Sequence, residues 1–417
     1  MTTLLLLATN IILFIGDGMS TPQRMTGEEF SRKLGLGPLV MNSFPCQATT
    51  RTYSASSLVT DSAASATAIA CGEKTYNGAV GVDKDGQRLT SCAEVAKAAG
   101  AKVGIVTSVT INHATPSGFY AHQPNRGCLK EIGFDLPKSN FDLFLGGGLE
   151  GGFPEVYQAA TDAGYTVFDL ENSQPLHLYM AKNKLWGHYR NEALPYAINK
   201  GNEPRLPELT SFALNFLDSK SLIDNSQFFL MVEGGRIDWA GHSNDAAANL
   251  RDLLELDDAI KVALDFQKSH PDTLIIVTGD HETGGMTMGF AGTGYAFYME
   301  KLAAQKCSAD QLDGKINYEG TEEEMFETLK TWFGFGTPGL ELSDSEKERL
   351  TRSFREHRLP DTCRRIMSEK SGVGWTSGSH TGLPALTTSI GPGSEKFTGL
   401  LNNTDISKCI KSFYLPR

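Results

Sequence analysis

Six short apolar runs, each followed directly by glycine or a polar residue, place the strongest constraint on the fold of this 417-residue chain. Runs that are apolar at nearly every position are typical of strands buried on both faces of a parallel sheet. The predicted strands are residues 10–15, 102–109, 141–145, 165–168, 227–232 and 273–278.

Helical patterns lie between these strands. Residues 91–99 and 206–217 are two of them, and residues 246–266 form a long amphipathic helix with Asn244 or Asp245 as its N-cap. Strands that alternate with helices predict an α/β fold, a three-layer sandwich with a large, mostly parallel central sheet and helices on both faces. Hydrophobic residues make up 40% of the chain, which is enough for a core of this size.

The charge of the chain limits the classes of partner that it can bind. The chain has 38 basic and 49 acidic residues and a net charge of −11, which argues against specific nucleic-acid binding because that needs a basic face. An acidic chain suits metal cations, although on the charge alone solubility is the better explanation. No window of 18 consecutive apolar residues occurs, so we expect no membrane span.

Cysteine usage and the N-terminus bear on the compartment. Seven cysteines leave at least one unpaired within the chain, and the lack of a C-x-x-C pair argues against a thiolate zinc site. The first basic residue is Arg24 and the apolar run at residues 4–8 is short. We therefore expect no intact secretory signal peptide.

Acidic, imidazole and hydroxyl side chains follow four of the predicted strands. Ligand sites in open α/β sheets lie beyond the carboxyl ends of the strands. A single Asp in such a place is more often a helix cap or turn residue, but four such places together favour a metal centre. The residues concerned are Asp17, His113, Thr115, Glu233, Asp238, His242, Asp280 and His281.

The spacing of these residues and the type of their ligand atoms indicate which cation each set would bind. Asp238 and His242 lie four apart, so one helical turn places both on one face. Asp280 and His281 are adjacent in TGDHETGG, and His380 stands among small residues in TSGSHTG. Imidazole and carboxylate ligands suit zinc. Each histidine taken alone would instead be a surface or hydrogen-bonded residue.

Three further residues offer only oxygen atoms. They are Asp17, Thr115 and Glu233, and a carboxylate and hydroxyl set of this kind suits a harder ion such as magnesium.

Ser62 is the candidate nucleophile. It stands at the start of a Ser- and Ala-rich helix at residues 62–71, which begins near Thr60 or Asp61. The positive end of the helix dipole and free backbone N–H groups stabilise both an alkoxide and a phosphate. From this segment alone, an N-cap role for Asp61 or Ser62 explains the pattern as well.

Arg126, in FYAHQPNRG, completes the candidate set. Its guanidinium presents a fork that fits two phosphate oxygens. Considered in isolation, it would be a surface arginine.

Taken together, these motifs resemble those of the alkaline phosphatases. They occur in the order found in that family and span nearly the whole chain. The matching segments are IGDGM at 15–19, VTDSAASATA at 59–68, HATPSGFYAH at 113–122, VEGGRIDWAGH at 232–242, TGDHETGG at 278–285 and SHTG at 379–382.

The resemblance implies a homodimeric phosphomonoesterase with two zinc ions and one magnesium ion. It would act on phosphate monoesters and inorganic phosphate, with Ser62 becoming transiently phosphorylated and Arg126 holding the phosphate. The implied zinc ligands are Asp238, His242 and His380 for one ion, and Asp17, Ser62, Asp280 and His281 for the other. The implied magnesium ligands are Asp17, Thr115 and Glu233, with Asp17 bridging, and the implied substrate-binding residues are Asp61, Ser62, His113, Arg126 and Trp239.

Two positions depart from the best-known bacterial form of the family. His113 stands where that form has Asp, and Trp239 stands where it has Lys, so Trp239 brings no positive charge to the phosphate. We predict that His113 contacts the magnesium shell and that magnesium binds more loosely as a result.

The spread of the implied site, from Asp17 to His380, predicts one domain over residues 1–417. Residues 285–378 depart from the strand and helix alternation and form an insertion, either a surface excursion or a crown or lid near the dimer interface. Because the family is usually exported, we expect a periplasmic or secreted protein. The candidate disulfide in such a protein is Cys71 with Cys92 or Cys128, although the sequence does not assign the pairing.

Several rival functions use related chemistry. A metal-dependent phosphodiesterase, a sulfatase or a cofactor-independent phosphoglycerate mutase can share the scaffold, and a non-catalytic metal- or phosphate-binding protein would keep the ligands. Arg126 favours a monoester with two free oxygens, and the presence of Ser62 argues against a non-catalytic protein.

Overall fold

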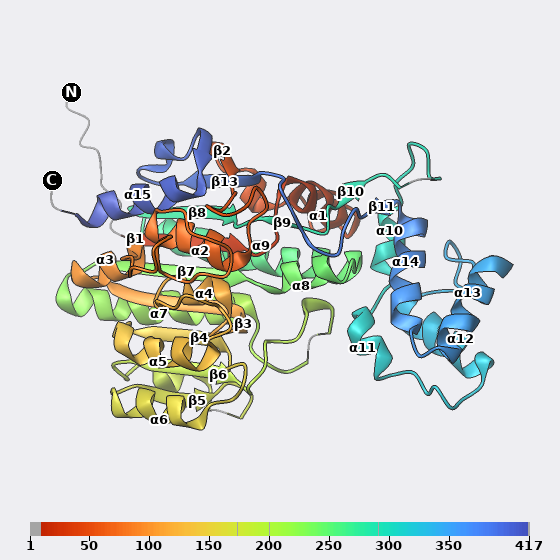
Figure 1. Cartoon of the computed structure of the whole chain (residues 1–417), viewed down its shortest axis with the longest axis horizontal. Coiled ribbons are helices and arrows are strands. Elements are labelled where there is room, and N and C mark those ends of the chain that lie inside the picture. Colours follow the sequence, from red (N-terminus) through yellow and green to blue (C-terminus); the bar gives the residue numbers. More distant parts are fainter. Residues whose placement is uncertain (1–9, 173, 200, 291, 416–417) are drawn as a thin grey trace.

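A ten-stranded sheet forms the centre of the computed structural model, which describes residues 10–172, 174–199, 201–290 and 292–415 (Figure 1). The apolar run at residues 4–8, on which the signal-peptide expectation rested, lies outside this range. The strands are β1 (Asn10–Gly16), β2 (Cys46–Arg51), β3 (Lys102–Thr110), β4 (Leu143–Gly147), β5 (Thr166–Asp169), β6 (Leu185–Tyr189), β7 (Phe228–Gly234), β8 (Thr273–Gly279), β13 (Ala385–Ile390) and β14 (Gly399–Asn402).

The strand order is β14-β2-β13-β8-β1-β7-β3-β4-β6-β5, and β13 is antiparallel to both of its neighbours. The pairs on the β8-to-β5 side of β13 are parallel, which confirms the expected mostly parallel sheet. All six predicted strands are present, as β1, β3, β4, β5, β7 and β8. The strands β2, β6, β13 and β14 were not predicted from the sequence.

Two short ribbons stand outside the main sheet. β9 (Glu282–Thr283) pairs with β12 (His380–Thr381), and β10 (Thr287–Met288) pairs with β11 (Val373–Gly374). The first ribbon joins segments that lie about a hundred residues apart in the chain, and it brings His380 next to the end of β8.

Helices cover both faces of the sheet, as predicted. In β1, the side chains of Ile12 and Phe14 join the buried cluster beneath one group of helices, while Ile11, Leu13 and Ile15 join the cluster on the opposite face. The first group is α1 (Thr21–Lys33), α7 (Leu206–Asp224) and α9 (Ala246–Ser269), and the second is α2 (Ser62–Cys71), α3 (Cys92–Ala98), α5 (Leu129–Ser139), α6 (Pro154–Asp162) and α15 (Asn403–Tyr414). This two-sided burial explains why β1 is apolar at nearly every position.

The capping alternatives are resolved by two hydrogen bonds. Asp245 is the N-cap of α9, because its carboxylate accepts a hydrogen bond of 3.2 Å from the Ala248 amide. Asp61 is the N-cap of α2, and its carboxylate accepts a hydrogen bond of 3.0 Å from the Ala64 amide.

Six shorter helices complete the part of the fold around the sheet. They are α4 (Ala114–Ser117), α8 (Arg236–His242), η1 (Val40–Asn42), η2 (Leu176–Tyr179), η3 (Ala197–Asn199) and η4 (Ser394–Lys396).

The segment at 285–378 is mostly helical and lies to one side of the sheet (Figure 1). Its buried side chains, among them Leu302, Leu329 and Ile366, belong to the same apolar cluster as those of α9. Its helices are α10 (Met299–Ala303), α11 (Ala309–Asp313), α12 (Glu322–Phe333), α13 (Asp344–Arg355) and α14 (Leu359–Ser371).

The cysteine pairing expected for an exported chain is not formed. All seven cysteines lie within the described residues and are free thiols. Cys71 and Cys92 pack as small apolar side chains in the core beneath α15, and burial raises the pKa of Cys92 to about 12, so the reactive thiolate is disfavoured. Among the described helices, none is both long enough and apolar enough to cross a membrane.

The carboxyl ends of β1 and β8 meet through a close backbone contact. Gly16 and Gly279 are register partners in the sheet, and a Cβ atom on Gly279 would lie only 1.8 Å from the Met19 carbonyl oxygen. A side chain at Gly279 would therefore push away the turn that follows β1. This contact places Asp17, in that turn, beside Asp280, which follows β8.

We predict that Gly279→Ala lowers the free energy of unfolding by about 3 kcal/mol, because a backbone atom blocks the new methyl group. Gly314→Ala is the matched control, since its Cβ would approach nothing closer than 3.8 Å. Denaturant unfolding of both variants tests this. Equal stability of the two would show that the turn accommodates a side chain.

Candidate metal centre

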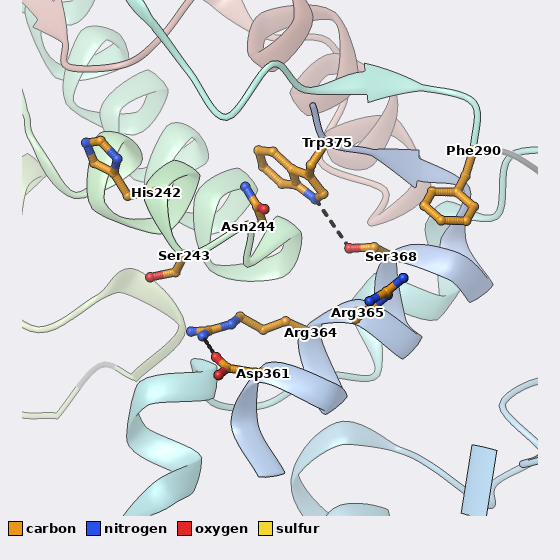
Figure 2. Close-up of a pocket in the computed structure, with 9 residues that line it drawn as sticks. All are labelled: His242, Ser243, Asn244, Phe290, Asp361, Arg364, Arg365, Ser368 and Trp375. Carbon is orange, nitrogen blue, oxygen red and sulfur yellow. Dashed lines mark hydrogen bonds and ion pairs between the residues drawn. The ribbon is translucent and has the colours of Figure 1, made fainter. Parts of the chain in front are cut away.

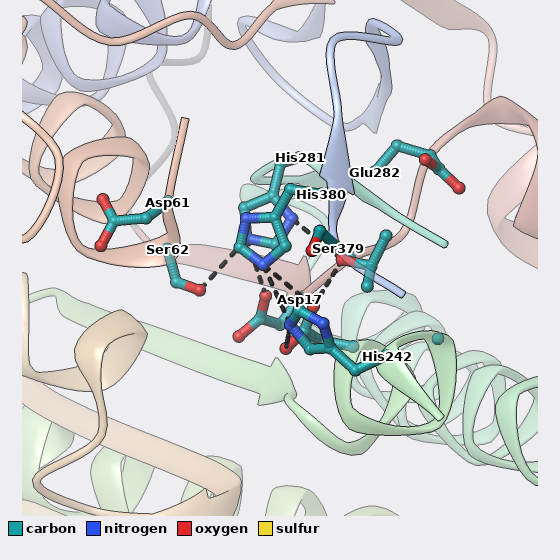
Figure 3. Close-up of polar contacts among 12 residues, drawn as sticks. Asp17, Asp61, Ser62, His242, His281, Glu282, Ser379 and His380 are labelled. Atoms are coloured by element: carbon teal, nitrogen blue, oxygen red, sulfur yellow. Dashed lines mark hydrogen bonds and ion pairs between the residues drawn. The ribbon is translucent and has the colours of Figure 1, made fainter. Parts of the chain in front are cut away.

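The predicted site residues converge at the carboxyl edge of the sheet, as Figure 3 shows for several of them. The neighbouring strands β8, β1 and β7 end next to Asp280, Asp17 and Glu233, and all three carboxylates have no solvent exposure. Helix α8 supplies His242, strand β12 supplies His380, and His281 lies between β8 and β9. Three groups have ligand atoms that all lie within 4.8 Å of one another: Asp238, His281 and His380; Asp17, Asp280 and His281; Asp17, His113 and Glu233.

Backbone carbonyls orient two histidines, His380 of the first group and His242 beside it. Nδ1 of His242 lies 2.8 Å from the Gly378 oxygen, and Nδ1 of His380 lies 2.9 Å from the Thr60 oxygen. A carbonyl only accepts, so each Nδ1 donates and each Nε2 lone pair faces the site.

The two Nε2 atoms lie 3.2 Å apart, and each also approaches Asp238, at 3.4 Å from His242 and 3.5 Å from His380. The spacing within α8 therefore brings Asp238 and His242 together as predicted. Two lone pairs and a carboxylate this close need a cation or a proton between them. The hydrogen bond with Asp238 raises the pKa of His242 to about 9, so the site favours positive charge.

The second group has the same character. His281 Nε2 lies 3.3 Å from Asp17 Oδ1 and 3.2 Å from Asp280 Oδ2. These two carboxylate oxygens are buried and have no hydrogen-bond partner among the described residues. Buried polar atoms without partners are costly, and a cation bound among them would remove that cost.

The third group contains Asp17, Glu233 and His113. Glu233 accepts a hydrogen bond of 2.5 Å from the Thr107 hydroxyl, but its other oxygen, Oε1, is buried without a hydrogen-bond partner among the described residues. The Thr115 hydroxyl donates a hydrogen bond of 3.3 Å to the Asp17 carboxylate. His113 Nδ1 is also buried and unpaired within the described chain, so the predicted proximity of His113 to the oxygen ligands is present.

Crowding of acidic groups shifts their pKa values upward. Burial, together with the charge of Asp280, raises the pKa of Asp17 well above its ordinary value. Burial raises the pKa of Glu233 to about 8, and burial with the charge of Asp238 raises that of Asp280 to about 7. Although burial opposes it, the hydrogen bond with His242 holds the pKa of Asp238 well below its usual range.

Ser62 lies at the edge of this cluster. Because Asp61 caps α2, Ser62 is the first helical residue, and its Oγ lies 3.1 Å from His281 Nε2. The side chain is buried and faces the second group of ligands (Figure 3). The structure thus assigns the cap to Asp61 and leaves the Ser62 hydroxyl available for chemistry.

Arg126 reaches the same place from the loop after α4. Its Nη1 lies 3.2 Å from Asp61, and its Nη2 lies 3.2 Å from His113 Nε2. Burial, with the charge of Arg126, lowers the pKa of His113 to about 3, so this imidazole is neutral. Trp239 contacts the His113 ring edge-on, with ring centroids 5.8 Å apart.

Two site residues were not found from the sequence. The Thr283 hydroxyl donates a hydrogen bond of 2.5 Å to Asp238 and lies 3.3 Å from His281 Nδ1. It therefore links two of the ligand groups. Thr107 orients Glu233 as described above. Thr283 lies within the TGDHETGG motif, but nothing in a single sequence distinguishes a hydroxyl of this kind from the other threonines.

Comparison with known proteins gives a consistent result. A family model described as alkaline phosphatase matches residues 8–163 and 157–415. Alkaline phosphatase 3 of Bacillus subtilis (strain 168) is 33% identical over 419 residues, which cover 96% of this chain and 87% of that protein.

Solved structures agree with the sequence match. A cold-active alkaline phosphatase from a psychrophilic Shewanella sp. has a TM-score of 0.88 and 29% identity, covering 98% of this chain and 100% of that one. A TAB5 alkaline phosphatase carrying a His-to-Asp substitution, with magnesium bound in its M3 site, has a TM-score of 0.73 and 30% identity, covering 98% of each chain.

The fold, the convergence of the motifs at one sheet edge and these matches lead to one assignment. The family is metal-dependent and hydrolyses phosphate monoesters, and the ligand clusters described above fit both properties. This chain belongs to the alkaline phosphatase family and is a phosphomonoester hydrolase.

Proposed function

We propose that the enzyme hydrolyses a broad range of phosphate monoesters through a phosphoseryl intermediate on Ser62, at a site for two zinc ions and one magnesium ion. The observation that carries the proposal is the position of the Ser62 hydroxyl, 3.1 Å from His281 Nε2 and at the N-terminus of α2.

The donor sets support the assignment of the ions. Two sets of imidazole and carboxylate ligands suit zinc, namely Asp238, His242 and His380, and Asp17, Asp280 and His281 together with Ser62. The oxygen-rich set of Asp17, Thr115 and Glu233, with His113 beside it, suits magnesium. When bound, such cations supply positive charge that stabilises the attacking and leaving oxygens of an in-line displacement.

The residues of the chain then act in a defined order. Arg126 holds two phosphate oxygens while Ser62 Oγ attacks phosphorus and the ester oxygen departs with the alcohol, taking up a proton. Water next attacks the phosphoserine, the P–Oγ bond breaks, and inorganic phosphate leaves. The backbone N–H groups at the start of α2 stabilise the phosphoryl group throughout.

The contacts of Arg126 favour monoesters over the rival substrates. Its guanidinium already lies between Asp61 and His113, on the Ser62 side of the site, where a phosphoryl group with two free oxygens would sit. A phosphodiester has only one such pair, already partly shielded by its second substituent. A sulfate ester has three free oxygens but one negative charge fewer than a phosphate monoester dianion, so Arg126 attracts it less strongly. Phosphodiesterase or sulfatase activity is therefore the second candidate and is expected to be weak.

The assembly and location remain part of the proposal. We propose a homodimer located in the periplasm or secreted, and a single domain in which residues 285–378 form a crown or lid. The continuity of the buried cluster between α9 and the helices of that segment supports the single domain.

We predict that Ser62→Ala lowers kcat/KM for p-nitrophenyl phosphate about a thousandfold or more, because the nucleophile is lost while Asp17, Asp280 and His281 still hold the ion beside it. Assays between pH 7 and 10, with bis-p-nitrophenyl phosphate and p-nitrophenyl sulfate alongside, test the reaction class. Full activity of the variant, or a better rate with the diester or sulfate, would contradict the proposal. Unchanged metal content serves as the control.

We predict that Asp280→Asn stabilises the metal-free protein but destabilises the loaded one. At pH 9, above its pKa of about 7, the buried Asp280 carboxylate repels Asp238 when no cation is bound. Thermal unfolding with chelator should show the variant about 2 kcal/mol more stable than the wild type, and the order should reverse with zinc and magnesium. The same order under both conditions would argue against cation binding by Asp280.

We predict that His113→Asp tightens magnesium binding about tenfold, because it replaces a neutral imidazole beside Asp17 and Glu233 with a hard carboxylate ligand. The TAB5 relative with a His-to-Asp substitution holds magnesium in its M3 site, which supports this direction. Magnesium titration by calorimetry measures the effect, and His113→Asn, which adds no charge, is the control. An unchanged affinity in His113→Asp would show that His113 does not influence the ion.

A further inference from the structure

A cavity of about 640 Å3 opens beside the metal centre, between α8 and α14 (Figure 2). His242 belongs to its wall and also lies beside the first ligand group, 3.4 Å from Asp238, and its side chain is 40% exposed. Two aromatic rings and two guanidinium groups also line it, from Phe290, Trp375, Arg364 and Arg365. The reaction proposed above uses none of these four.

The cavity lies on the side of the site opposite Ser62. Ser62 Oγ contacts His281, the His281 ring stacks on His380 with centroids 3.6 Å apart, and His380 Nε2 lies 3.2 Å from His242. Figure 3 likewise shows Ser62 and His242 on opposite sides of the two stacked rings. In an in-line displacement the leaving group departs opposite the nucleophile. The alcohol part of the substrate therefore points toward His242 and the cavity.

The aromatic part of the wall is held in place. The indole Nε1 of Trp375 donates a hydrogen bond of 3.3 Å to the Ser368 hydroxyl, and the ring packs on Gly284. A Cβ on Gly284 would lie 2.5 Å from the indole, and the residue has φ of +92°, so glycine is required there. Trp375 and Phe290 are both half-buried, and aromatic faces of this kind stack on planar rings.

The charged part of the wall holds two guanidinium groups and one carboxylate, that of Asp361. Arg364 is balanced, because Asp310 lies 3.0 Å away and Asp361 also pairs with it. Arg365 shares the single carboxylate of Glu369 with Arg349, and among the described residues it forms a hydrogen bond only through its Nε, at 3.2 Å. Its side chain is 77% exposed, so the terminal nitrogens are open to a ligand. With these partners, three arginines face three carboxylates, so this cluster has no net charge and the open terminal nitrogens of Arg365 are what it offers to an anion.

We propose that this cavity binds the leaving group of the substrate and that it fits an alcohol carrying both a planar aromatic ring and a second anionic group, as in a nucleoside bisphosphate. Trp375 and Phe290 contact the ring, and Arg365 pairs with the second anion. A volume of about 640 Å3 lies within the usual range for sites that enclose ligands of this size. The inference rests on the proposed function, since it takes Ser62 as the nucleophile.

Four substrates separate the two contributions. Glycerol 3-phosphate has neither feature, AMP has the ring, fructose 1,6-bisphosphate has the second anion, and adenosine 3′,5′-bisphosphate has both. We expect Arg365→Gln to lower kcat/KM about tenfold for the two bisphosphates and to leave the other two unchanged. Phe290→Ala should lower kcat/KM several-fold for the two adenosine compounds only. Arg355→Gln is the matched control, because Arg355 is an exposed, ion-paired arginine on α13 that does not line the cavity.

Failure of the inference differs from failure of the proposed function. If the wild type hydrolyses all four substrates but Arg365→Gln and Phe290→Ala change none of the ratios between them, the cavity is not the leaving-group site. If the wild type does not hydrolyse glycerol 3-phosphate, or Ser62→Ala retains activity, the proposed function itself is wrong. Equilibrium binding of adenosine 3′,5′-bisphosphate to Ser62→Ala, with and without Arg365→Gln, should show the same tenfold loss without turnover, and equal affinities would overturn the inference.

Discussion

The burial of several carboxylates at one edge of the sheet is the constraint on which the site depends. Asp17, Glu233 and Asp280 have no exposure, Asp238 is almost fully buried, and three of the four carry raised pKa values. Like charges held this close in a region of low dielectric repel strongly unless cations or protons lie between them. The positions of the histidines, of Ser62 and of Arg126 around these carboxylates are consistent with a site that binds positive charge.

The scaffold supplies the rigidity that such an arrangement needs. β1 lies between β7 and β8 in the middle of the sheet, and helices pack on both of its faces, so the ends of these strands have little freedom to move apart. The close contact between Gly279 and the Met19 carbonyl then sets the spacing between Asp17 and Asp280. Repulsion between the ligands is thus opposed by the packing of the whole core, which explains how one protein can hold an unfavourable cluster ready for cations.

Much of the fold could be predicted because its central strands are unusual in composition. Strands buried on both faces, such as β1 and β8, are apolar at nearly every position and stand out from the sequence. β2 and β13 were missed because they alternate or consist largely of threonine, and their hydroxyls bond to each other, as in the 2.6 Å contact between Thr50 and Thr387. β6 was missed because glycine and histidine interrupt its short apolar run.

The sequence by itself determined the chemical inventory: a candidate nucleophile at a helix start, the carboxylates after strands, the histidines in glycine-rich motifs and the family to which they point. These are local features, because a helix N-terminus or a strand end is encoded within a few residues. Only the tertiary structure decided which groups share a ligand cluster, that Asp61 rather than Ser62 caps α2, and that Thr283 connects Asp238 to His281. It also placed the aromatic and arginine side chains of the 285–378 segment beside His242. Those relations depend on strand order, on the β9–β12 ribbon and on backbone contacts between residues hundreds of positions apart, and no local pattern in the chain specifies them.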